Sequence, residues 1–103
     1  MVIRGTAGQA ILGTDTRVLV LPPFVPGATH AAVPSWPYLD VLGLEMNERA
    51  VGGSIALRVP EGETVVGVSG DWDSIRSRIA TLRGLVAGAH RDAIPAELRL
   101  VAL

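Results

Sequence analysis

The sequence contains no cysteine and no lysine, and aromatic residues make up only 4% of it. Without cysteine the chain can form no disulfide and can use no thiolate chemistry, which leaves its redox compartment open. No uninterrupted apolar run reaches the length of a membrane-spanning helix. The first residues, MVIRGTAG, lack the long apolar region of a signal peptide. We therefore expect a protein of the cytoplasm or of a soluble assembly, with no membrane partner.

Basic charge is scarce as well. The nine basic side chains are all arginines scattered along the chain, and the net charge is −1 at pH 7. A nucleic-acid-binding domain usually carries a basic patch or stripe, so we expect no nucleic-acid partner. Arginine without lysine can mark bidentate carboxylate or phosphate contacts. Because the arginines are scattered, we instead interpret the composition as that of a GC-rich genome, bacterial or phage.

Hydrophobic residues are abundant, at 49% of the 103 residues, which separates this chain from disordered segments. The length is typical of one domain, and no internal repeat or low-complexity segment divides it. The sequence therefore predicts a single small domain over residues 1–103, with enough apolar side chains for a buried core.

An amphipathic helix over residues 71–88 is the strongest pattern. Its apolar stripe has helical spacing and consists of Trp72, Ile75, Ile79, Leu82 and Val86. Asp71 is placed to accept the free N–H groups of the first turn, and Asp73 adds negative charge at the positive end of the helix dipole. Gly88 suits the position just after a helix. We predict that this helix covers the core.

Six segments have the composition of strands. They are residues 2–4, 9–12, 17–21, 54–59, 64–69 and 98–103. Residues 17–21 are apolar at nearly every position, which predicts a central strand covered on both faces. The order strand, helix, strand over residues 64–103 predicts a βαβ unit with parallel pairing. Together these patterns predict an α+β fold, with a four- to five-stranded mixed sheet and the main helix on one face.

Residues 22–37 contain five prolines, which exclude a regular helix or a central strand there. The segment is too apolar for a typical flexible linker, so we predict an ordered loop. Phe24, Val25, Trp36 and Tyr38 are our candidate interaction residues, because aromatic side chains often anchor interfaces. The alternative is that these side chains cover the core of their own chain.

Residues 38–49 fit two structures. Leu39, Leu42 and Met46 match one face of a helix, whereas Leu42, Leu44 and Met46 alternate as in a strand. Gly43 weakens the helical interpretation. We nevertheless favour a short second helix over about residues 36–48.

The stretch VVGVSGDWDS, residues 65–74, joins a strand to a helix as phosphate-binding sites do. Its glycines do not have the G-x-G-x-x-G spacing, and the carboxylates of Asp71 and Asp73 would repel a phosphate. We therefore interpret both aspartates as helix caps. No nucleophile elbow is present, and nothing places His30 and His90 together. We expect no catalytic residue, no metal site and no cofactor.

Three functions remain open at this point. The first hypothesis is a non-catalytic interaction or assembly component that binds a protein partner or itself. It would be a structural subunit of a homo-oligomer or of a larger particle such as a virion. The second is a small-ligand binding domain with a pocket under the proline-rich loop. The third is a small enzyme that uses Asp71, Asp73 and a histidine.

Overall fold

A computed structural model of the chain describes residues 1–23, 26–27 and 33–94. The first sheet has the strand order β1-β2-β3-β4, with bounds Val2–Arg4, Ala10–Gly13, Arg17–Leu21 and Ser35–Pro37. The second sheet has the order β5-β6-β7, with bounds Gly43–Glu48, Gly53–Val59 and Gly62–Val68. One long helix, α1, spans Trp72–Asp92, and two short 3-10 turns are η1, Thr6–Gly8, and η2, Tyr38–Asp40.

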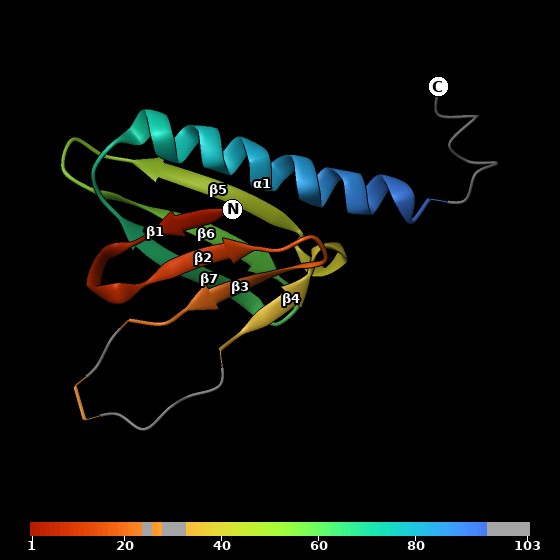
Figure 1. Cartoon of the computed structure of the whole chain (residues 1–103), viewed down its shortest axis with the longest axis horizontal. Coiled ribbons are helices and arrows are strands. Elements are labelled where there is room, and N and C mark those ends of the chain that lie inside the picture. Colours follow the sequence, from red (N-terminus) through yellow and green to blue (C-terminus); the bar gives the residue numbers. More distant parts are fainter. Residues whose placement is uncertain (24–25, 28–32, 95–103) are drawn as a thin grey trace.

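The α+β class is confirmed, but the strands form two antiparallel sheets and not one mixed sheet (Figure 1). Tight connections such as Gly13 to Arg17 and Val59 to Gly62 join sequence neighbours, and a tight connection forces antiparallel pairing. Residues 54–59 and 64–69, both predicted as strands, correspond to β6 and β7, which pair as a hairpin with Ile55 opposite Val66. The predicted parallel pairing depended on residues 98–103, which lie outside the described residues.

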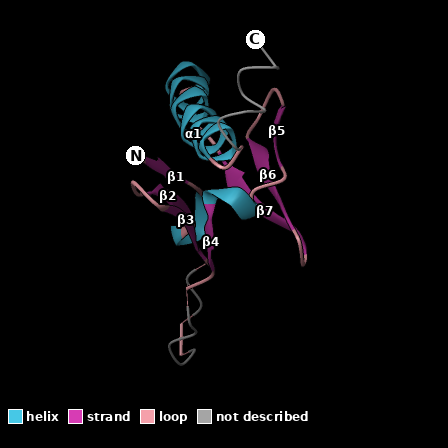
Figure 2. Cartoon of the chain, turned by 90° about the vertical axis from the view of Figure 1, so that its right-hand side faces the viewer, coloured by secondary structure: helices cyan, strands magenta, loops and turns pink. Residues whose placement is uncertain are grey.

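Helix α1 lies along the opening between the two sheets, as the end-on view shows (Figure 2). The predicted stripe is confirmed: Ile75, Ile79 and Leu82 retain 7%, 1% and 0% of their exposed surface. Their side chains join both sheets in one core, whose buried residues include Ile11 from β2 and Leu57 from β6. The helix thus supplies the third wall of the core.

Polar side chains of α1 also bond to the edge strands β1 and β5, one in each sheet. Arg78 Nη1 donates to the carbonyl oxygen of Val2 at the edge of β1. On the other side, Arg83 Nη2 donates to the Leu44 carbonyl of β5 at 3.1 Å. Unpaired strand edges invite further strands, so these side chains cover backbone acceptors that would otherwise be open.

The helix is longer than predicted at its C-terminal end. We expected Gly88 to end it, whereas α1 continues to Asp92 with both Gly84 and Gly88 inside it. A glycine within a helix costs about 1 kcal/mol relative to alanine. The packing of Ala89 against the core offsets this cost, as does the bond from His90 Nε2 to the Val41 carbonyl oxygen at 3.2 Å.

Strand β3 is central in its sheet, but only one of its faces is fully covered. Val18 and Val20 are buried at 0% and 5% exposure, whereas Leu19 and Leu21 are half-buried. The prediction that residues 17–21 are covered on both faces was therefore wrong, because the second sheet and α1 lie on one side only. The last residues of the proline-rich segment form β4, a three-residue edge strand that pairs with β3.

The predicted helix over residues 36–48 was also wrong. After the single turn of η2 the chain forms strand β5, in which Leu44 lies opposite Leu57 and Met46 opposite Ile55. The helical match of Leu39 and Met46 was a coincidence of spacing. Pairing with β6 decides the outcome, because a strand that gains a partner overrides weak local propensity.

The helix stripe provides the first test. We expect Ile79→Ala to lower the free energy of unfolding by about 2–5 kcal/mol, because it removes fully buried methyl and methylene groups and leaves a cavity. Chemical denaturation measures this loss. Ser77→Ala, on the exposed face of α1, is the control and should change stability by less than about 0.5 kcal/mol. A loss for Ile79→Ala as small as that of the control would contradict the role of α1 in the core.

Candidate interaction surface

Asp71 and Asp73 are both engaged at the start of α1. Asp71 Oδ1 accepts the backbone N–H groups of Asp73 at 3.0 Å and Ser74 at 3.4 Å, so Asp71 is the N-cap. Asp73 pairs with Arg76 at 2.7 Å, and Arg76 also pairs with Glu48 of β5. Both carboxylates therefore have structural partners at the start of α1.

The residues of the enzyme hypothesis are not brought together. His90 lies in the last turn of α1, about 30 Å along the helix axis from Asp71. Its ring bonds to the Val41 carbonyl oxygen at 3.2 Å, and His30 lies outside the described residues. Within the part of the chain that the structure describes, no three His, Cys, Asp or Glu side chains gather in a way that could hold a metal ion.

The predicted interaction residues of the proline-rich segment divide into two groups. Phe24 and Val25 lie outside the described residues. Trp36 is half-buried against the core, and its indole N–H donates to Glu61 Oε2 at 3.2 Å. Tyr38 retains only 3% exposure. Tyr38 is thus part of the core of its own chain, whereas Trp36 packs against that core and stays partly exposed.

Tyr38 has a further electrostatic property. Its hydroxyl donates to the backbone carbonyl of Thr14, which ties η2 to the β2–β3 turn. Burial raises the pKa of its phenol above the ordinary 10.0, and the nearby charge of Asp15 raises this pKa further. Both effects favour the neutral form, the one that donates the hydrogen bond.

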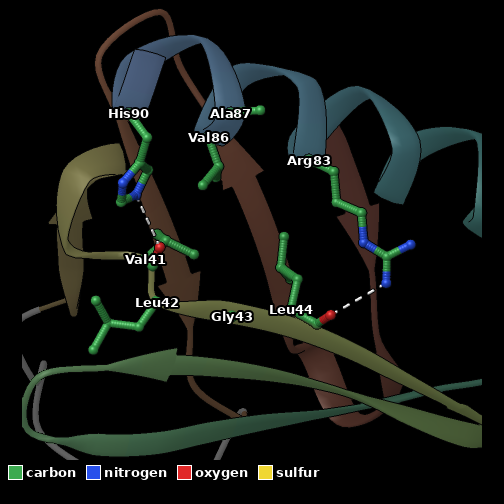
Figure 3. A pocket seen from close by; sticks show the side chains of 8 residues that line it. All are labelled: Val41, Leu42, Gly43, Leu44, Arg83, Val86, Ala87 and His90. Carbon is green, nitrogen blue, oxygen red and sulfur yellow. Dashed lines mark hydrogen bonds between the residues drawn. The ribbon is translucent and has the colours of Figure 1, made fainter. Parts of the chain in front are cut away.

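Two grooves flank the C-terminal half of α1. The first, which we name the β5 groove, has a volume of about 300 Å³ and is open to solvent (Figure 3). It is lined by Val41, Leu42, Gly43, Leu44, Arg83, Val86, Ala87 and His90. Its two polar side chains, Arg83 and His90, already donate to the carbonyl oxygens of Leu44 and Val41. The groove therefore presents mainly apolar surface.

The second groove, which we name the η2 groove, lies where α1 packs on η2 and has a volume of about 620 Å³. It is lined by Asp15, Thr16, Pro37, Tyr38, Leu39, Gly84, Leu85, Gly88, Ala89, Asp92 and Ala93. Among the described residues, a methyl group at Gly84 would meet no atom within 4 Å, and one at Gly88 only the guanidinium of Arg91 at 3.7 Å. The two glycines thus leave space along the α1 side of this groove.

Exposed apolar side chains lie around the same end of α1. Leu39 and Leu42 are 48% and 57% exposed, and Ile94, two residues beyond the helix, is 40% exposed. Sequence reasoning missed this surface because the predicted second helix placed Leu39 and Leu42 on a buried face. The signal that could have found it is Gly84-x-x-x-Gly88, two glycines four residues apart within a helical pattern.

Comparisons of the chain with protein-family models, with curated proteins and with solved structures found no match. No helix among the described residues is both long enough and apolar enough to cross a membrane.

The cap provides a second test. Asp71→Ala should cost about 1 kcal/mol of unfolding free energy, because the first-turn N–H groups lose their acceptor. Asp71→Asn should keep most of the stability, since the amide oxygen caps about as well. Thermal or chemical denaturation distinguishes the two variants. Equal stability of both variants and the unmodified chain would contradict a capping role.

The single tyrosine of the chain allows a direct titration. The ultraviolet absorbance of the phenolate should appear above the ordinary pKa of 10.0. The folded-state pKa is raised above the unfolded value. The contribution of Tyr38 to the free energy of unfolding is therefore complete below the ordinary pKa and is lost as the pH rises through the folded-state pKa. Asp15→Asn should move the titration part of the way back. Titration at or below the ordinary pKa would contradict the burial of this phenol.

Proposed function

We propose that this protein is a non-catalytic assembly component that associates with a second copy of itself. The interface in this proposal is the surface around the C-terminal half of α1, which comprises the β5 groove, the η2 groove and the exposed side chains of Leu39, Leu42 and Ile94. We refer to it as the α1 surface. The observation that carries the proposal is this concentration of exposed apolar groups beside two open grooves.

The grouping matters more than the exposure of any one residue. Single exposed hydrophobic residues are normal on a soluble protein, whereas contiguous apolar patches mark interaction sites. Burial of apolar surface yields about 25 cal/mol per Å², so exposed leucines such as Leu39 and Leu42 gain from a partner. A two-fold contact uses the patch twice, which helps a small domain reach the roughly 1,000 Å² that a specific interface needs.

Charge around the α1 surface also suits a second copy. Asp15 and Asp92 line the η2 groove, whereas Arg83 lines the β5 groove and Arg91 follows His90 at the end of α1. A surface that carries both signs is self-complementary under a two-fold rotation that places acidic groups opposite basic ones.

The other two hypotheses have less support. A small-ligand site usually combines an enclosed apolar pocket with a few convergent polar groups. Both grooves are open, and Arg83 and His90 already bond to backbone carbonyl groups. An enzyme based on Asp71, Asp73 and His90 would need groups that sit at opposite ends of α1. We therefore favour assembly over binding of a small ligand or catalysis.

The proposal is tested through Leu42, which is more exposed than Leu39 or Ile94. Leu42→Ser should weaken self-association by about tenfold, a loss of ~1.4 kcal/mol in binding free energy, while the thermal melt stays nearly unchanged. Sedimentation velocity over a range of concentrations measures the association. Val51→Ser is the matched control, because Val51 is 93% exposed in the β5–β6 turn and lies outside the α1 surface. A protein that stays monomeric at high concentration, or equal effects of the two variants, would contradict the proposal.

A further inference from the structure

We propose that residues 95–103 of one copy occupy the η2 groove of the other copy, and that the exchange is reciprocal. This inference rests on the proposed self-association and names the segment that mediates it. It joins three features: a groove that the described chain leaves unfilled, the position where the chain leaves α1, and the composition of the residues that follow.

The chain leaves α1 at the groove itself. Ala93 lines the η2 groove, and the next residue, Ile94, is 40% exposed. The nine residues that follow read PAELRLVAL, with large apolar side chains at Leu98, Leu100, Val101 and Leu103. Such a segment gains from an apolar site, and its starting point brings it within reach of the α1 surface of an adjoining copy.

The dimensions of segment and groove agree. The groove follows α1 from Gly84 to Asp92, eight residues, or about 12 Å at the helical rise. Residues 98–103 in an extended form span about 20 Å, enough to cover that length. An extended segment also alternates its side chains, so one side can face the groove while the other faces solvent.

The glycines of α1 fit a closely approaching segment. Gly84 and Gly88 each weaken the helix by about 1 kcal/mol relative to alanine. A Cβ added at Gly84 would meet no atom of the described residues within 4 Å. Nothing within the described residues therefore requires glycine at position 84. A segment laid against the helix requires a shallow floor, and glycine provides one.

Charge in the groove matches the segment as well. Asp15 and Asp92 are the ionisable groups with formal charge at pH 7 that line the η2 groove. Asp92 also lies 4.0 Å from Arg91. The segment carries Glu97 and Arg99, and the guanidinium of Arg99, between two leucines, can meet the carboxylate of Asp15 while the leucines contact apolar surface.

The neighbouring copy is favoured over the same copy because of Pro95. A residue before proline is disfavoured in the helical region, so Pro95 opposes continuation of α1 through Ile94. Occupation of its own groove would require the chain to reverse direction within a few residues. Occupation of a neighbour's groove needs no such reversal, and a two-fold exchange forms the contact twice.

The absence of cysteine makes the experiment direct. In the full chain, Ala102→Cys introduces one thiol that takes a nitroxide spin label at a single position. Isotope-labelled protein without the nitroxide is mixed with nitroxide-labelled protein without the isotope. Broadening of the Gly84 and Gly88 amide signals in the isotope-labelled copies then reports contact between copies. We expect these two signals to lose at least about half of their intensity on mixing, and the signal of Val51 to stay unchanged.

A groove variant separates docking from folding. Gly84→Leu fills the groove with a better helix former, so the melting temperature should hold or rise while the broadening disappears and association weakens by about tenfold. Ser77→Leu adds a leucine on the exposed face of α1 about 10 Å along the axis from Gly84, outside the residues that line the groove, and should leave both readouts unchanged. Within the segment, Leu100→Asp should remove the broadening, whereas Ala96→Asp, which adds the same charge without removing a large apolar group, should keep it.

The outcomes distinguish this inference from the proposed function. Self-association without broadening between copies would overturn the exchange and leave the assembly proposal standing. A second sample contains chains that carry both the isotope and the nitroxide, diluted in unlabelled protein. Broadening in this sample alone would show that the segment occupies the groove of its own chain, which also overturns the exchange. A chain that does not associate at all would overturn both.

Discussion

The packing of α1 into the opening between the two sheets is the constraint on which the rest of the structure depends. Its stripe of Ile75, Ile79 and Leu82 completes a core to which both sheets contribute. On either side, Arg78 and Arg83 donate to backbone acceptors of β1 and β5. One element thus removes apolar surface from water and covers the facing strand edges of both sheets.

Much of this arrangement follows from local patterns in the sequence. Helical spacing predicted α1 and its buried face, and composition predicted the segments that form β6 and β7. The division into two sheets could not be predicted, because alternation indicates a strand without naming its partner. Residues 43–48 illustrate the limit, since pairing with β6 overrode a spacing that also matched a helix.

The candidate site was less accessible to sequence reasoning than the fold. Asp71 could be assigned as a cap because capping depends on neighbours along the chain. The contacts of Trp36 with Glu61 and of Tyr38 with Thr14 could not be predicted, because these partners are distant in sequence. The α1 surface was missed for the same reason, since Leu39 and Leu42 become exposed only once η2 and β5 take their places.

The two halves of α1 differ in how deeply their side chains are buried. Its fully buried residues end at Leu82, and beyond that position Leu85, Val86 and Ala89 are only partly buried. The fold therefore depends mainly on the first half. The second half contains both glycines of the helix and so reduces its stability. The packing of Leu85, Val86 and Ala89 against the core and the bond from His90 to the Val41 carbonyl oxygen offset this cost and carry the helix on to Asp92. The α1 surface is built partly from core residues such as Tyr38 and Val41, so only its exposed positions, such as Leu39 and Leu42, can change without loss of the fold.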